Sequence, residues 1–148
     1  MKVLNSLLDA YPRGIRMESE GKRLALHTAA AGRATPRVIT TLVTAYPAAT
    51  RHRNTDGFLP LHLSCTWYAK KDVVDILLTD RNACKTQDEL GNLPIHSACF
   101  SGTSSAVVEA ILKAYPKAVL ARNHQGSLPE DITKRLKHEN RVSVLALL

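Results

Sequence analysis

The stretch Leu59–Cys65, "LPLHLSC", returns as "LPIHSAC" at 93–99. A weaker copy, "LALH", stands at 24–27, and "LPED" comes next at 128–131. The leading leucines at 24, 59, 93 and 128 therefore recur every 34–35 residues. A fixed period of this length predicts a repeat architecture in which similar units stack along the chain.

The first half of each unit predicts a tight turn followed by a helix. Gly57, Gly91 and Gly126 stand two residues before their leading leucines and follow polar residues, which is typical of turns that need a positive φ. The prolines at 60, 94 and 129 suit the first position of a helix, where the missing N–H costs nothing. Apolar residues then recur at helical spacing.

The second half of each unit predicts another helix. A valine lies fourteen residues after each leading leucine, and large apolar residues come four and five positions later, with the weaker Ala146 and Leu147 in the last unit. Thr35 before Pro36 is typical of a helix N-cap followed by its proline. Three copies close on Ala-Tyr-Pro, at 10–12, 45–47 and 114–116, where proline pushes the preceding residue out of the α region. Each unit is thus turn, helix, loop, helix.

These motifs resemble the ankyrin repeat, whose pattern of about 33 residues opens its first helix with T-P-L-H-x-A. Here leucine replaces the threonine. The resemblance implies an all-α solenoid of stacked helix-turn-helix units with short turns or hairpins between them. We expect one domain over 1–148, made of a half-repeat (1–20), three repeats (21–56, 57–90 and 91–125) and a C-terminal cap-like repeat (126–148). The cap is expected because charged Glu130, Asp131 and Lys134 replace the residues of the earlier motif.

Composition narrows the class of protein. The 148 residues are 45% hydrophobic and 22% charged, which predicts a globular chain, and the net charge of +7 favours an acidic partner. An odd number of cysteines without disulfide-framework spacing favours a reducing, intracellular location in cytoplasm or nucleus. No apolar run approaches the length of a membrane span, and no convincing signal peptide opens the chain. We expect a monomer with no membrane association.

The repeated histidine and cysteine could suggest a zinc site or a Cys/His catalytic pair. Equivalent residues of stacked helices lie about 8–10 Å apart, so they form a ladder and do not converge on one ion. We expect His27, His62 and His96 to bond nearby backbone, and Cys65 and Cys99 to be small core residues. Phosphate-binding and catalytic motifs are also missing from the sequence. The sequence therefore predicts no enzyme, no cofactor and no metal.

Positions that break the repeat are the candidate binding residues. Leu63, Trp67, Tyr68 and Phe100 lie along or just after the first helices, which in ankyrin-like proteins line the concave face, and aromatic residues are typical of interface hot spots. The alternative for Trp67 is that it fills a gap left by the longer inter-helix loop. A second set, at or near the turns, would steer and orient a partner: Lys22, Arg23, Arg51 and Arg53.

The resemblance implies a non-catalytic module for protein–protein interaction or scaffolding, which binds a partner on its concave face and turn tips. Two alternatives stay open. The basic turn residues could bind nucleic acid or another polyanion, although interspersed acids and the lack of a nucleic-acid motif make this less favoured. The chain could also be the recognition segment of a larger signalling protein or enzyme.

Overall fold

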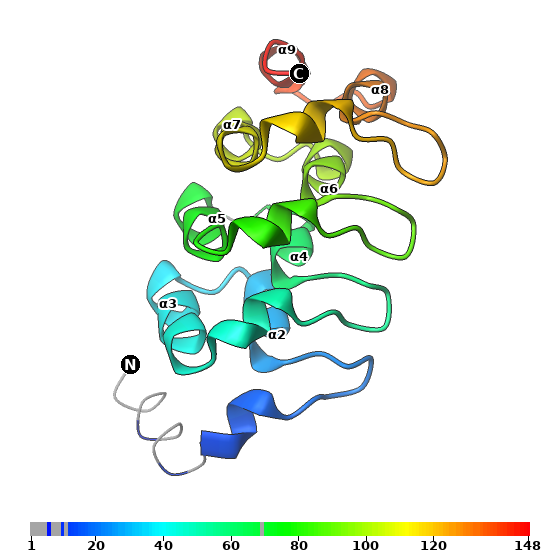
Figure 1. The fold of residues 1–148 in the computed structure, drawn as a ribbon. Coiled ribbons are helices and arrows are strands. Elements are labelled where there is room, and N and C mark those ends of the chain that lie inside the picture. Colours follow the sequence, from blue (N-terminus) through cyan, green and yellow to red (C-terminus); the bar gives the residue numbers. More distant parts are fainter. Residues whose placement is uncertain (1–5, 7–9, 11, 69) are drawn as a thin grey trace.

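The computed structural model describes residues 6, 10, 12–68 and 70–148, and in these the chain is an all-α solenoid. Helices alternate between two rows (Figure 1). One row, next to the projecting loops, holds α2 (Ala25–Ala31), α4 (Pro60–Thr66), α6 (Pro94–Ser101) and α8 (Pro129–Arg135). The other row holds α3 (Pro36–Ala45), α5 (Lys71–Leu77), α7 (Ser105–Ala114) and α9 (Arg141–Leu145). We call them the inner row and the outer row.

The helix starts agree with the sequence prediction. Pro60, Pro94 and Pro129 are the first residues of α4, α6 and α8. Thr35 is the N-cap residue of α3, as predicted, and its side chain makes no capping hydrogen bond. Thr35 is exposed, and α3 begins at the proline that follows it, whose fixed φ favours the helix.

The Ala-Tyr-Pro segments end helices, as predicted, and 3-10 helices follow them. Tyr46 and Tyr115 are the C-cap residues of α3 and α7, whereas Tyr11 lies outside the described residues. The chain then continues as 3-10 helices, which the sequence analysis did not predict. They are η1 (Pro12–Arg16), η2 (Pro47–Arg51), η3 (Arg81–Lys85) and η4 (Pro116–Leu120). The second unit lacks the tyrosine and proline, and there the Asp80 side chain accepts a hydrogen bond from the Asn82 N–H at the start of η3.

The core is a continuous aliphatic cluster between the two rows. Its largest fully buried members include Leu26, Ile39, Leu61, Leu77 and Ile95. Inner helices pack on inner helices and outer on outer along the stack, so each unit covers the apolar face of its neighbour. This is the stabilising principle of a solenoid, in which no unit needs to fold alone.

The fourth unit replaces apolar and histidine positions with charged ones. Asp131 takes the place of the histidine, and its Oδ2 accepts a hydrogen bond from the Leu128 N–H at 2.9 Å. Glu130 is half-buried and forms an ion pair with Lys134 one turn later. The unit therefore keeps the start of its first helix while presenting a polar surface.

Candidate binding surface

The hairpin loops that project from the inner row are held by an acceptor side chain in each loop. Asn54 Oδ1 accepts from the N–H groups of Asp56 and Phe58. Asp88 Oδ1 does the same in the next loop, and Asn123 Oδ1 in the one after that. The glycines adopt the predicted positive φ, for example +77° at Gly57.

Neighbouring loops are also joined to one another by backbone hydrogen bonds. Thr55 N–H donates to the Gly21 carbonyl, Glu89 N–H to the Asp56 carbonyl, and His124 N–H to the Leu90 carbonyl, at 3.0–3.1 Å. The row of loops is therefore a preorganised structure, so that a partner bound to it costs little ordering of the chain.

The repeated histidines fasten these loops to the inner helices. Nδ1 of His27, His62 and His96 accepts from the backbone N–H of the leading leucine three residues earlier, at 3.1–3.2 Å. Because Nδ1 is an acceptor, the proton of the neutral ring is on Nε2. Nε2 then donates to backbone carbonyls before the next inner helix, such as those of Asn92 and Ala121 at 3.1 Å. The predicted structural role of the histidines is confirmed.

Burial keeps these rings neutral. The pKa of His27 and that of His62 are each lowered to about 4, chiefly because burial disfavours the charged ring, and the pKa of His96 is lowered for the same reason. Both ring nitrogens of each histidine are used by the backbone, so none is free to bind a metal. Among the residues that the structure describes, no group of histidine, cysteine and acidic side chains could hold a metal ion.

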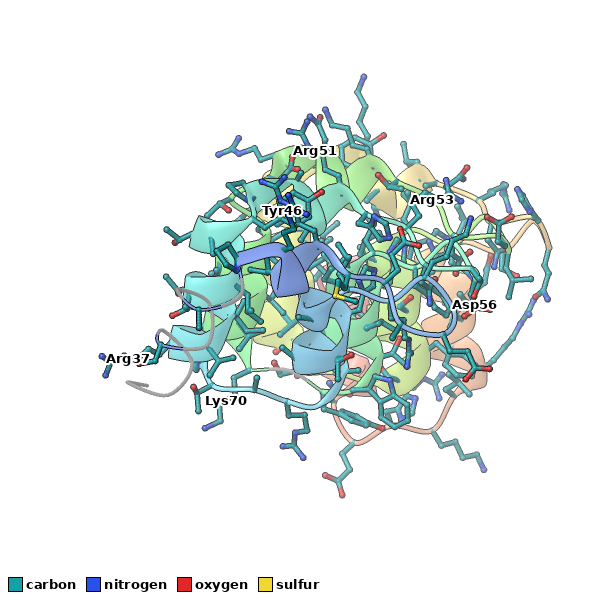
Figure 2. All side chains as sticks on the ribbon, turned by 90° about the horizontal axis from the view of Figure 1, so that it is seen from below. Arg37, Tyr46, Arg51, Arg53, Asp56 and Lys70 are labelled. Atoms are coloured by element: carbon teal, nitrogen blue, oxygen red, sulfur yellow. The ribbon has the colours of Figure 1, made fainter. Side chains whose placement is uncertain are left out.

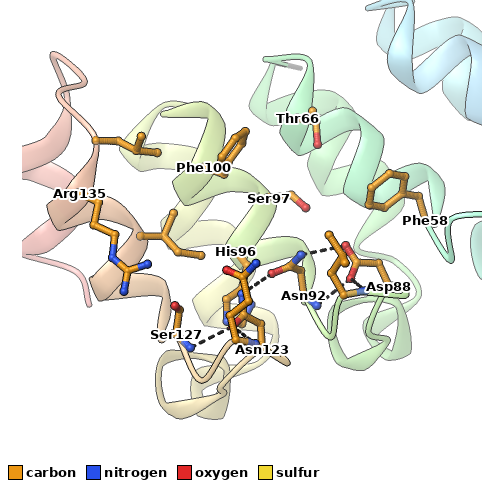
Figure 3. A pocket seen from close by; sticks show the side chains of 14 residues that line it. Phe58, Thr66, Asp88, Asn92, His96, Ser97, Phe100, Asn123, Ser127 and Arg135 are labelled. Carbon is orange, nitrogen blue, oxygen red and sulfur yellow. Dashed lines mark hydrogen bonds between the residues drawn. The ribbon is translucent and has the colours of Figure 1, made fainter.

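A groove of about 380 Å³ lies between the hairpin loops and the inner helices α6 and α8, and it reaches Phe58 and Thr66 of the unit before them. Its walls carry large apolar side chains, of which Phe100 is 65% exposed and Leu90 59%. Figure 3 shows Asp88, Asn92, Asn123 and Ser127 beneath them in a line of hydrogen bonds, with Phe58 and Arg135 at opposite ends. The side chains that line the groove also include Ile132 and Leu136.

Of the two charged side chains that described residues contribute to the groove, Asp88 is occupied by hydrogen bonds within the chain and Arg135 is accessible to a partner. Asp88 is buried, and its carboxylate accepts from two backbone N–H groups and from the Asn92 side chain. Arg135 is exposed and forms no ion pair with any residue in the described part of the chain. The groove thus offers an apolar surface and one free guanidinium, a combination that suits a partner with an apolar side chain and a nearby carboxylate.

The structure separates the four predicted contact residues. Phe100 lines the groove, whereas Trp67 and Tyr68 lie in the loop after α4, 53% and 54% exposed. Such exposure is incompatible with Trp67 as a gap filler. Leu63 is only 3% exposed, because α4 is covered on both sides by α2 and α6, so its prediction as an accessible contact is wrong.

Two of the predicted steering cations are already paired. Arg51 lies in η2, away from the hairpin tips, and its guanidinium binds the carboxylate of Asp80, which holds the pKa of Asp80 below its ordinary value. Arg53 binds Glu89 of the next loop at 2.9 Å. Lys22 and Arg23 lie in the first hairpin without an ion pair in the described chain. Of the four predicted basic residues, only Lys22 and Arg23 of the first hairpin are therefore left without an ion pair among the described residues.

Some groove residues were missed from the sequence. Leu90 breaks the repeat, because Asp56 and Gln125 occupy its place in the neighbouring units, and this was a usable signal. Arg135 falls in a mixed-charge segment of the last unit and carries no such signal. Only the fold brings it into the same groove as Phe100.

Comparison with known families agrees with the architecture. A family model described as ankyrin repeats, in three copies, matches residues 26–123. The chain belongs to the ankyrin repeat family. Ankyrin repeats are generally protein–protein interaction modules and are typically non-catalytic. No curated protein matches the chain. None of the described helices is long and apolar enough to cross a membrane.

Proposed function

We propose that this chain is a non-catalytic recognition module that binds a segment of another protein in the groove between its last two inner helices and their hairpin loops. The observation that carries the proposal is the exposure of Phe100 and Leu90 over a groove whose one free charge, among the described residues, is Arg135. Aromatic and arginine side chains dominate the energy of protein interfaces when they become buried on binding.

Different residues of the groove have different roles in the proposed binding. The hydrogen-bonded line from Asp88 to Ser127 is satisfied internally and fixes the shape of the groove. The apolar wall supplies affinity by losing water, and Arg135 orients a carboxylate of the partner. Lys22 and Arg23, at the far end of the stack, would act on the approach of an acidic partner at long range.

The nucleic-acid alternative is less favoured. It requires several free cations along the loops, yet Arg51 and Arg53 are paired with Asp80 and Glu89. We retain the five-part division of the chain at 20, 56, 90 and 125 as a proposal, together with the alternative that the module is part of a larger protein.

The test is affinity capture by the immobilised chain from a nuclease-treated lysate, followed by mass spectrometry. We expect a defined protein to be retained at about physiological salt and at about threefold higher salt. Phe100→Ala with Arg135→Ala should weaken its binding about tenfold or more. Leu120→Ala is the matched control, because Leu120 is exposed in η4 and does not line the groove. Binding unchanged by the groove variant but lost with the control contradicts the proposal.

A further inference from the structure

A second surface lies at the opposite edge of the inner helices. The loops that join inner to outer helices in the first two units share a depression of about 350 Å³, with Arg33, Thr35 and Lys70 in its lining. Arg37 and Lys70 lie on the side of the molecule away from Arg53 and Asp56 of the hairpin loops (Figure 2). We call the set Arg33, Arg37, Trp67, Tyr68 and Lys70 the loop edge.

The cations of the loop edge have no counter-charge within the described part of the chain. Arg33, Arg37 and Lys70 are exposed, and none forms an ion pair with a described residue. Arg37 belongs to the first turn of α3, and Lys70 is the N-cap residue of α5. Cations are unfavourable at these positions because the helix dipole is positive there. Their charges therefore do not stabilise the fold and are available to carboxylates of a partner.

The backbone of the loop edge also carries a cost. Arg33 and Tyr68 have left-handed φ angles of 56° and 58°, and the equivalent position of the third unit is Gly102, with φ 68°. Glycine adopts this conformation without the steric penalty that a β-carbon brings. The first two units thus hold a large exposed side chain at a position where the third unit has glycine, which needs no side chain for the fold.

Aromatic surface lies beside the free charges. Trp67 and Tyr68 are each about half exposed, and they precede Lys70 in the same loop. Indole and phenol rings next to cations provide apolar area and ionic complementarity together. We propose that the loop edge is a second docking surface, whose occupant is an acidic segment of a partner protein that carries aspartate or glutamate on both sides of an apolar side chain.

This inference rests on the proposed function as a protein-recognition module, and it adds a surface outside the groove. Carboxylates of the segment would pair with Arg33, Arg37 and Lys70, and its apolar side chain would cover the Trp67 ring. Three cations across two adjacent loops match a short acidic peptide better than a nucleic-acid backbone, which would need a longer track of positive charge.

The experiment is an NMR titration of the ¹⁵N-labelled chain with a short synthetic peptide of aspartate and glutamate around one central leucine. We expect saturable amide shifts confined to 32–37 and 67–73. The double variant Arg33→Gly with Tyr68→Gly should weaken peptide binding about tenfold. Because glycine relieves the left-handed backbone, the variant should melt no lower than the native protein, so the loss cannot be ascribed to unfolding. Lys117→Ala, which removes an exposed charge from η4, is the control and should bind normally.

Three outcomes would overturn the inference: no saturation at millimolar peptide, shifts spread equally over all basic residues, or tighter binding of single-stranded oligo-dT than of the peptide to the same loops. Binding of the protein retained in the affinity capture distinguishes failure of this inference from failure of the proposed function. If the groove variant releases that protein and the loop-edge variant neither releases nor weakens it, the groove stands and the second surface falls.

Discussion

Acid should unfold this protein in part by charging His62, and the structure sets the size of the effect. His62 is fully buried, and its pKa is lowered to about 4 from an ordinary 6.5. Burial is the main cause; Arg53 and His96 act in the same direction, while the Asn92 carbonyl and Asp88 oppose it. Between pH 6.5 and 4 the unfolded chain binds a proton that the folded chain refuses, so the free energy of unfolding decreases as the pH falls.

The free energy of unfolding should fall by about 1.4 kcal/mol for each pH unit in that window, or by about 3 kcal/mol in all from His62 alone. Above pH 6.5 the ring is neutral in both states, so His62 causes no further change. His27, with its pKa also near 4, acts in the same direction. The measurement is urea unfolding by circular dichroism from about pH 7.5 to about pH 4.5, with the ¹H signals of the ring as a direct check of its protonation.

His62→Asn is the informative variant. Asparagine keeps an acceptor for the Leu59 N–H, as Asp131 does for Leu128, but it loses the bond to the Asn92 carbonyl. At about pH 7.5 the variant should be less stable by about 1–3 kcal/mol because a buried carbonyl loses its partner. The difference should shrink toward zero near pH 4.5.

His124→Asn is the control, because His124 is exposed on a hairpin, and its profile should run parallel to that of the native protein. A constant difference between the native protein and His62→Asn at every pH would refute the reasoning.

Two further predictions concern the turns and the thiols. Gly126→Ala should cost about 1–2 kcal/mol, because a β-carbon would meet no atom within 4 Å and only the positive φ of 75° opposes it. Gly57→Ala should cost about twice as much, because its β-carbon would lie 2.8 Å from the Glu89 backbone nitrogen; equal costs in urea unfolding would contradict this. Burial raises the pKa of Cys65 to about 12 and that of Cys84 and Cys99 to about 11. The three thiols should therefore resist a disulfide reagent in the native protein and react fully in urea, and fast native labelling would contradict their burial.

The parts of the fold that every unit needs could be predicted from the sequence. Gly57 has a positive φ and Pro60 begins a helix. Because both residue types recur in the later units, they show where each repeat begins. The 3-10 helices were missed because the proline after Tyr46 indicates where α3 ends but does not determine the conformation of the next residues. Thr35 was correctly predicted as an N-cap, but N-cap preference does not establish that its hydroxyl makes a hydrogen bond.

The candidate site was predictable only in part, because exposure and pairing depend on neighbours that are distant in sequence. Phe100 was found as a repeat-breaking residue, but the same criterion selected Leu63, which the flanking helices bury. Arg51 and Arg53 are basic and near the turns, yet their partners Asp80 and Glu89 come one unit later. Sequence position alone does not show that those charges are neutralised.

A sharper criterion comes from the positions where one unit uses glycine and another does not. In the first three units the loop after the inner helix holds a left-handed residue, which is Gly102 in the third unit, and Arg33 and Tyr68 fill the equivalent places at a cost to the backbone. Helix packing does not explain those side chains, since both are exposed. In a repeat protein the requirements of the fold recur once per unit, so an exposed side chain that departs from them at a strained position is the residue whose role must be sought outside the chain.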